Sequence, residues 1–264
     1  MTELSDEQLE RYARHIVLRD IGGVGQKKLL GAHILIIGAG GIGCPAIQYL
    51  AAAGIGALTI VDDDVVSLSN LQRQVLFTVN DIGQPKVEVA KKAALAINPD
   101  IVINTVNQRL TPSNFSRDAT IFSEHSLTQF DAILDGSDNY QTRLLVSDFS
   151  LAHHIPLVSA AIGQFQGQLG VFRGWEADKP CYRCFVGDAL DPDDCDNCSE
   201  VGVLGAMVGL MGSFAAMEAI RVVTGFGDDP AGKLQLFDGL RPAMRGINLP
   251  KDPECNSCGA QTGA

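Results

Sequence analysis

The chain is short of positive charge. Its 264 residues include 20 lysines and arginines against 31 aspartates and glutamates, which gives a formal net charge of −11. A nucleic-acid-binding surface needs clustered basic residues, so this balance argues against a nucleic-acid partner. At this length the chain can form one large α/β domain or two small ones.

The sequence also lacks a secretory signal and a clear membrane span. No apolar segment followed by a small-residue cleavage site occurs near the N-terminus. The one long apolar stretch, residues 201–223, contains Glu218 and Arg221, and its uncharged part is too short to span a bilayer. We therefore expect a buried helix there, no membrane partner and a cytoplasmic protein.

Cysteine is too sparse for a disulfide scaffold, with seven residues in the whole chain. Two Cys-x-x-Cys pairs, Cys181 with Cys184 and Cys255 with Cys258, lie about 70 residues apart. Each pair can direct two sulfurs at one ion, and two pairs complete a closed tetrahedral site. The sequence thus predicts a structural Zn²⁺ and a reducing compartment. A redox role is the alternative, although nothing thioredoxin-like surrounds either pair.

The histidines show no catalytic or metal-binding spacing. No Ser/His/Asp set is evident either, so we expect any chemistry of this chain to depend on cations and a metal. The five histidines are His15, His33, His125, His153 and His154.

A glycine-rich loop follows the apolar run at residues 34–37 and precedes an expected helix. An acid, Asp62, comes about twenty residues further on. This is the pattern of a nucleotide-binding βαβ unit, in which phosphates lie at the helix N-terminus and the acid binds the ribose. A tight turn without a ligand is the alternative. The glycines are Gly38, Gly40, Gly41 and Gly43.

The segment after Asp62 carries more amide and cationic groups than a dinucleotide requires. Two bridging phosphates need little help beyond a helix N-terminus, whereas a triphosphate about to be cleaved needs much more. The sequence therefore favours ATP, although a single cation is more often a solvated surface charge. The residues are Ser69, Asn70, Leu71, Gln72, Arg73 and Gln74, followed by Lys86.

Acids follow the strand expected at residues 130–134. Open α/β sheets bind ligands at the carboxyl ends of their strands, and an acid facing phosphates there suits Mg²⁺. We favour Asp138 for the metal, while Asp135 is equally suited to a structural role. An aspartate N-cap on a helix beginning near Asn139 is the alternative.

Strands alternate with helices in the first half of the chain, which indicates a Rossmann-like, doubly wound, mostly parallel sheet. After residue 138, closely spaced strands indicate an antiparallel C-terminal extension. No clear linker occurs, so we expect one domain over residues 1–264, with halves at 1–150 and 151–264. The expected strands are 34–37, 58–61, 101–106, 130–134, 157–161, 168–172, 233–237 and 243–249; the expected helices include 5–16, 42–53 and 85–97.

A third Cys-x-x-Cys pair, Cys195 and Cys198, lies in an acidic segment before the apolar stretch. Neighbouring aspartates raise a thiol pKa, and a helix N-terminus partly offsets them. A catalytic role for Cys198, structural inertness and a second metal site all stay open. Cys44 is most simply a small buried hydrophobe.

Taken together, the motifs resemble the ThiF/MoeB/HesA family, the bacterial relatives of the ubiquitin-activating enzymes. The resemblance covers residues 7–258, and segments 3–21 and 67–74 look more like the MoeB branch than the ThiF branch. The motifs are Arg14, GAGGIG at 38–43, Asp62, SNLQRQ at 69–74, Lys86 after Gly-Gln-Pro, SDN at 137–139, CYRC at 181–184, Asn197-Cys198 before VGVLG, and CNSC at 255–258.

This resemblance implies a homodimeric adenylyltransferase that uses ATP and Mg²⁺. It would activate the C-terminal glycine of a ubiquitin-like sulfur carrier ending in Gly-Gly, releasing pyrophosphate. The MoeB branch serves the molybdopterin-synthase carrier, hence molybdenum cofactor biosynthesis, and the ThiF branch serves the thiamine-thiazole carrier. The first half would bind the nucleotide, and the second half the carrier and zinc.

The resemblance also implies roles for single residues. Asn70, Arg73 and Lys86 would contact phosphates, Asp138 would hold magnesium, and Arg14 would reach the site from the other subunit. Residues 187–200 would cover the carrier's tail. The family commonly has a single cysteine before the apolar helix, so the additional Cys195 leaves the part of Cys198 in sulfur transfer open.

Two rival functions belong to other classes. An NAD-dependent oxidoreductase would need an acid/base for hydride transfer, and none is evident. A non-catalytic, zinc-stapled carrier-binding module is the second rival, and the intact set of Arg73, Lys86 and Asp138 argues against it.

Overall fold

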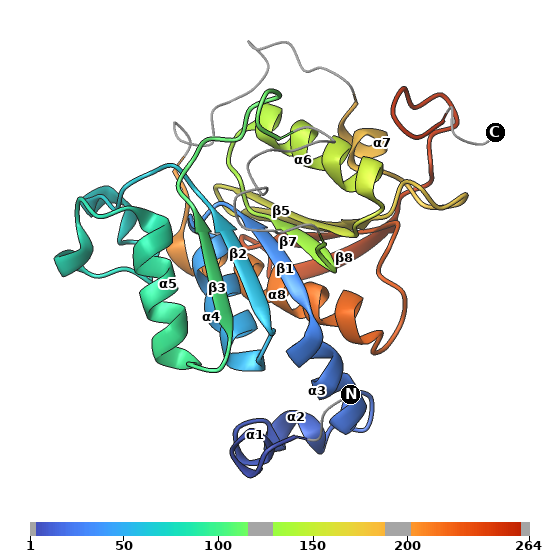
Figure 1. The fold of residues 1–264 in the computed structure, drawn as a ribbon. Coiled ribbons are helices and arrows are strands. Elements are labelled where there is room, and N and C mark those ends of the chain that lie inside the picture. Colours follow the sequence, from blue (N-terminus) through green and yellow to red (C-terminus); the bar gives the residue numbers. More distant parts are fainter. Residues whose placement is uncertain (1–3, 116–128, 188–201, 260–264) are drawn as a thin grey trace.

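Eight strands form one mixed sheet in the order β3-β2-β1-β4-β5-β6-β7-β8 (Figure 1). The computed structural model describes residues 4–115, 129–187 and 202–259. The first five strands are parallel, and the last three continue the sheet antiparallel, which confirms the predicted fold class. The strands are β1 (His33–Ile37), β2 (Ala57–Val61), β3 (Val102–Val106), β4 (Ala132–Asp135), β5 (Leu157–Gly163), β6 (Gln166–Phe172), β7 (Lys233–Asp238) and β8 (Ala243–Asn248).

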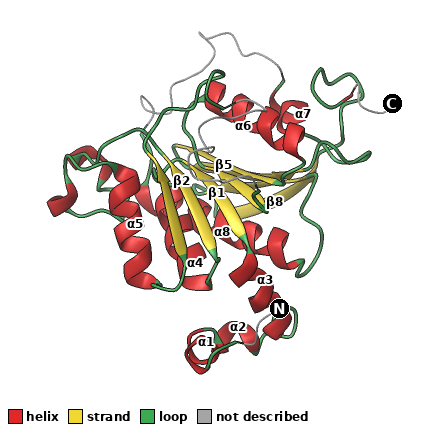
Figure 2. Cartoon of the chain, viewed as in Figure 1, coloured by secondary structure: helices red, strands yellow, loops and turns green. Residues whose placement is uncertain are grey.

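Helices cover both faces of the parallel part of the sheet (Figure 2). Successive residues of a strand point to opposite faces, and β1 is apolar on both. Ile34 and Ile36 join one core cluster, while Leu35 and Ile37 join another. The first cluster lies under α4 (Gly43–Ala53), α5 (Lys86–Ile97) and α8 (Gly205–Thr224), and the second under α6 (Tyr140–His153).

The strand order reverses between β1 and β4. The chain runs outward from β1 through β2 to β3 and then returns to β4 on the other side of β1. The last residues of the two central strands, Ile37 and Asp135, are direct neighbours in the register. Open α/β sheets form their ligand crevice at such a switch point, outside the carboxyl ends of the strands.

The N-terminal segment differs from the single helix expected over residues 5–16. The predicted capping box at Ser5 is present, but α1 (Asp6–Arg11) ends at Tyr12 and α2 (Ala13–Ile16) follows. Tyr12 is only 2% exposed, and its hydroxyl accepts a hydrogen bond from Asn98 at 2.8 Å. Burial of this side chain against the body of the protein therefore outweighs continuation of the helix.

The apolar stretch forms α8, a helix of 20 residues that is long and apolar enough to cross a membrane by length and composition. It packs against α4, β5 and β6, and Gly212 allows close approach to Pro45 and Ile42. Its buried Glu218 pairs with Arg221 at 3.0 Å. These contacts agree with the expected buried helix.

Candidate active site

A cavity of about 470 Å³ opens at the carboxyl ends of β1, β2 and β4. Its walls come from the glycine loop after β1, the acids after β2, the segment around Arg73, and the loops after β3 and β4. This volume is within the usual range for small-molecule sites. The structure thus brings to one crevice motifs that are spread over more than half of the chain.

The glycine loop is shaped by close backbone approaches. Gly38 has φ +89°, which favours glycine, and its N–H donates to the carbonyl of Val61 at 2.8 Å. A side chain on Gly43 would collide with the carbonyl of Gly38. Gly38, Gly40 and Gly41 line the cavity, whereas Gly43 does not and instead permits tight packing of the first turn of α4.

Asp62 lies between the glycine loop and the cavity. Its Oδ2 accepts the N–H of Ala39 at 2.7 Å, and its Oδ1 accepts the N–H of Asp64 at 2.9 Å. Burial raises the pKa of Asp62, and the Lys86 ammonium opposes that rise. The carboxylate predicted to bind a ribose therefore also holds the loop in place.

The cationic groups expected to contact phosphates reach the same cavity. Asn70, Arg73 and Lys86 all line it. Arg73 is braced by a hydrogen bond from Nη1 to the carbonyl of Ser69 at 3.1 Å. Lys86 is 4% exposed, and its Nζ lies 2.7 Å from Oδ2 of Asp64. One buried and one partly buried cation at the same crevice suit an anionic ligand.

Not every residue of the predicted phosphate-binding segment reaches the cavity. Ser69, Leu71 and Gln72 do not line it. Ser69 supplies the carbonyl that braces Arg73, and the carbonyl of Gln72 lies against Gly205 at the start of α8. Ser69 and Gln72 therefore support the segment through contacts outside the cavity.

The loop after β4 divides its acids between two roles. Asp138 is exposed and lines the cavity, and within the described ranges no hydrogen bond or ion pair engages its carboxylate. Asn139 also lines the cavity and caps α6, with Oδ1 accepting the N–H of Thr142 at 2.8 Å. The helix N-cap is thus Asn139 rather than an aspartate.

Asp135, in contrast, is fully buried and engaged. Its Oδ1 accepts from both the N–H and the hydroxyl of Ser137, at 3.0 and 2.7 Å. Arg143 of α6 lies 3.8 Å from its Oδ2 and donates to Ser159, Ala160 and Ser137. Asp135 therefore anchors the loop, and Asp138 is the acid that faces the cavity.

The fit of a magnesium ion rests on Asp138. Mg²⁺ in nucleotide sites is held by one or two carboxylates together with substrate phosphates. An exposed carboxylate that is unengaged among the described residues, on a cavity also lined by two cations, fits that donor set.

Several cavity residues had not been predicted. Gln108, Arg109 and Leu110 follow β3, and Arg109 pairs with Asp63 at 3.6 Å. Their position after the carboxyl end of a parallel strand could have predicted that they line the ligand crevice. Val208 also lines the cavity and comes from α8, which no local pattern connects to this site, whereas Gln74, which lines it too, belongs to the segment that the sequence had already indicated.

Arg14 does not line the cavity of its own chain. It belongs to α2, which lies near α1 and α3 (Gly22–Gly31), beyond the amino end of β1 (Figure 1). The cavity is at the carboxyl end of the same strand. Any contact of Arg14 with this site must therefore come from a second copy of the chain.

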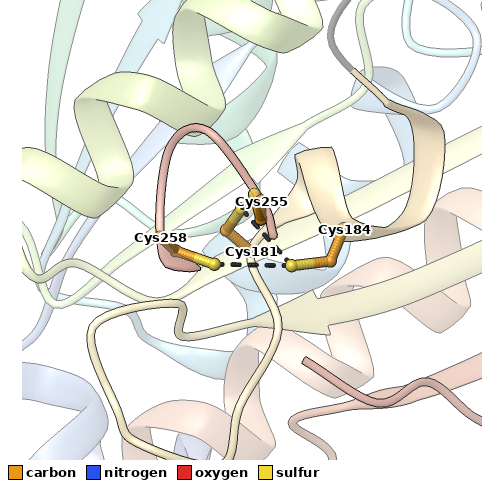
Figure 3. Close-up of side chains that lie close together, drawn as sticks. All are labelled: Cys181, Cys184, Cys255 and Cys258. Atoms are coloured by element: carbon orange, nitrogen blue, oxygen red, sulfur yellow. Dashed lines mark hydrogen bonds between the residues drawn. The ribbon is translucent and has the colours of Figure 1, made fainter. Parts of the chain in front are cut away.

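The four cysteines of the two outer pairs converge (Figure 3). Their sulfurs all lie within 4.8 Å of one another, with separations of 3.9, 3.6 and 3.4 Å along Cys181–Cys184, Cys181–Cys255 and Cys184–Cys258. A Zn–S distance of about 2.3 Å in a tetrahedron gives sulfur separations of about 3.8 Å. The cluster therefore fits zinc, and none of its four cysteines lines the cavity.

One thiol of the cluster, Cys184, gives up its proton readily, whereas the pKa values of Cys181 and Cys258 are raised, chiefly by the hydrogen bond to Cys184 for Cys181 and by burial for Cys258. The pKa of Cys184 is lowered by the hydrogen bond from Cys181, and the N–H of Asp252 adds to the effect at 3.5 Å. A closed four-sulfur set with no open position is typical of a structural site. Arg183 further fixes α7 (Tyr182–Val186) to α6 by a bidentate pair with Asp148 at 2.8 and 2.7 Å.

The remaining cysteines fall into two groups. Cys195 and Cys198 lie outside the described residues, as does most of the 187–200 segment. Cys44 is fully buried in α4, and burial raises its pKa to about 12. It behaves as the small hydrophobe that was expected.

Residues 12–257 match the ThiF family. The chain is 41% identical over 259 residues to the molybdopterin-synthase adenylyltransferase of Escherichia coli (strain K12), covering 98% of this chain and all of that protein. It is 42% identical over 257 residues to the sulfur carrier protein ThiS adenylyltransferase of the same strain, covering 97% of each. The crystal structure of E. coli MccB with MccA-N7isoASN has a similar fold, with TM-score 0.79 and 22% identity over 94% of this chain and 75% of that one.

Proposed function

The chain belongs to the ThiF family, and from that membership we propose that it adenylates the C-terminal glycine of a ubiquitin-like sulfur-carrier protein. ATP is the second substrate and pyrophosphate is released. The enzyme is an adenylyltransferase, as are its relatives by name.

The observation that carries this proposal is the meeting of Arg73, Lys86 and Asp138 on the wall of the cavity that also holds the glycine loop. A carrier carboxylate is already ionised near neutral pH, so its attack on the α-phosphate needs no general base. It must instead overcome repulsion between like charges. Cations offset that repulsion and stabilise the charge that develops on phosphorus and pyrophosphate.

We assign the contacts to the phosphates to Asn70, Arg73 and Lys86, and the ribose to Asp62. Bound magnesium, held by Asp138 and the phosphates, would neutralise charge on the leaving group. Arg73 reaches the cavity from a braced turn, and Lys86 is held by Asp64 until an anion arrives.

The oxidoreductase alternative has less support. Among the described cavity residues there is no histidine, tyrosine or cysteine to act as an acid/base for hydride transfer. The alternative of a non-catalytic binding module does not explain why Arg73, Lys86 and Asp138 all line the nucleotide crevice.

We propose a homodimer in which Arg14 completes the partner's site. The support is its distance from its own cavity, described above, together with exposed apolar side chains in the segment that holds Arg73. Leu68, Val75 and Val79 are 69%, 64% and 66% exposed. Clustered exposed apolar residues commonly mark a protein interface.

For the carrier itself we propose that of molybdopterin synthase, and hence a place in molybdenum cofactor biosynthesis. The carrier for the thiamine thiazole is the alternative, since relatives of both names are equally similar to this chain. We further propose that residues 1–264 act as one domain, because one sheet runs through both halves.

The test is ATP–pyrophosphate exchange with purified carriers. Exchange should require a carrier ending in Gly-Gly and should vanish when the last glycine is removed. Comparison of kcat/KM for the two carriers identifies the branch. Equal exchange with the truncated carrier, or a change in nicotinamide absorbance without exchange, would reject the proposed reaction.

A further inference from the structure

Gln74 is the buried polar side chain of the cavity that has no recognised task. It is 3% exposed and lines the cavity beside Arg73. Its Oε1 is buried and has no hydrogen-bond partner among the residues that the structure describes. Its Nε2 is the atom nearest to the place that a Cβ on Gly40 would occupy, 3.9 Å away. Within the described residues, no hydrogen bond engages either end of this carboxamide.

The backbone fixes the position of this side chain. The N–H groups of Arg73 and Gln74 both donate to the carbonyl of Asn70, at 3.0 and 2.9 Å. The N–H of Phe77 in turn donates to the carbonyl of Gln74 at 3.1 Å. The turn that presents Arg73 to the cavity therefore also directs Gln74 toward the glycine loop.

A buried, unpaired amide is costly, because the group loses its hydrogen bonds to water without replacing them. A leucine or methionine of similar size would fill the same space without that cost. An amide in such a place therefore calls for an explanation. A phosphate would not satisfy Oε1, but it can accept from Nε2, which lies at the glycine loop and has no partner among the described residues. Phosphate oxygens accept hydrogen bonds only, and Nε2 is the donor end.

We propose that Gln74 is a phosphate-binding residue: Nε2 donates a hydrogen bond to the phosphates of the bound nucleotide at the glycine loop. This rests on the proposed use of ATP. The contact adds a neutral donor at the glycine loop that precedes α4, so it orients the phosphates without further charge. This role differs from those proposed for Arg73 and Lys86, whose positive charges neutralise the negative charge of the phosphates.

This role predicts opposite changes in stability and in binding. Gln74→Leu removes the unpaired Oε1, so the melting temperature of the ligand-free protein should stay the same or rise. ATP affinity and pyrophosphate exchange should fall roughly tenfold to a hundredfold. Gln74→Glu removes the donor and adds a negative charge beside the triphosphate, so its loss should be larger still.

The experiment measures three quantities on the full chain: the melting temperature without ligand, ATP affinity by calorimetry, and pyrophosphate exchange with the carrier. Gln26→Leu is the matched control for the melting temperature. Gln26 is fully buried too, but its amide is paired with Ala53 at 2.9 Å and with His15 at 3.0 Å. The control should therefore lower the melting temperature.

The pattern expected is a stable Gln74→Leu protein with weakened ATP binding. Wild-type ATP affinity in Gln74→Leu or in Gln74→Glu would overturn the proposal. So would a fall in melting temperature for Gln74→Leu like that of Gln26→Leu, because Gln74 would then serve the fold. ATP affinity is measured without a carrier, so a wild-type protein that binds ATP but exchanges no pyrophosphate refutes the proposed function separately.

Discussion

At the scale of single residues, two aspartates three positions apart have different surroundings and therefore different expected roles. Asp138 is exposed on the cavity wall, whereas Asp135 is fully buried and hydrogen-bonded to Ser137 and Ser159. Replacement of Asp138 removes an acid from the cavity wall that we propose holds magnesium. Replacement of Asp135 leaves the buried Arg143 without its acid.

We therefore expect Asp138→Ala to lower pyrophosphate exchange by on the order of a hundredfold or more with little change in unfolding free energy. Asp135→Ala should instead lower the unfolding free energy by about 3–5 kcal/mol, the usual result of removing one partner of a buried pair. Exchange assays and denaturant titrations separate the two. Asp178→Ala, at an exposed acid that pairs with Lys179, is the control for both. A wild-type rate in Asp138→Ala at limiting magnesium would show that this residue has been assigned wrongly.

Cys198 poses a different question at this scale, because adenylation needs no thiol. Cys198→Ala should leave pyrophosphate exchange nearly intact and abolish only later transfer of sulfur. The assays are exchange on the one hand, and detection of a covalent carrier adduct sensitive to reductant or hydroxylamine on the other. Parallel Cys195→Ala separates the two thiols. Full sulfur transfer in both variants would make them structural and the adenylate the final product.

At the scale of elements, Arg143 links α6 to the loop that presents Asp138. Its guanidinium donates to Ser159 Oγ at 3.1 Å, to Ala160 at 2.9 Å and to the carbonyl of Ser137, next to Asp138. Arg143→Lys keeps the charge but loses the fork of donors. We expect exchange to fall several-fold, with a higher magnesium concentration needed for half-maximal rate. An unchanged magnesium dependence would limit Arg143 to stabilising the fold.

The cysteine cluster joins two other elements, α7 and the chain around Cys255. Because metal binding is coupled to folding, Cys255→Ser should lower zinc content and melting temperature together. Trp175 is the one tryptophan of the chain and packs against the cluster, so its fluorescence should follow removal of the metal by a chelator. Cys44→Ala, a buried cysteine of α4, should keep one zinc per chain. Full zinc in Cys255→Ser would reject the four-sulfur site.

At the scale of the whole molecule, the separation of Arg14 from its own cavity can be tested by complementation. Arg14→Ala and Arg73→Ala proteins should each be nearly inactive alone. In a mixed dimer, the subunit with intact Arg73 receives Arg14 from its partner, so one of the two sites is complete. Random exchange makes half of the dimers mixed, and the mixture should recover roughly a quarter of the wild-type rate. No recovery, with mixed dimers verified by mass spectrometry, would place Arg14 outside the reaction.

Much of this molecule follows from local patterns. The alternation of apolar runs with helical segments predicted the sheet, and the fold comparison confirms it. The spacing of the glycines before an acid pointed to the crevice, and two Cys-x-x-Cys pairs pointed to one cluster. These signals are readable because strand period, turn glycines and metal-ligand spacing are all set within a few residues of chain.

Only the tertiary structure decided the rest. The break at Tyr12 depends on a hydrogen bond to Asn98, 86 positions away, which outweighs local helix propensity. The division between Asp135 and Asp138 depends on Arg143 and Ser159, and the orphaned amide of Gln74 depends on the packing around it. Sequence determined which groups exist and where strands end. Which of those groups are paired, buried or left facing the cavity was decided by contacts between distant segments, because such contacts form only when the whole sheet is assembled.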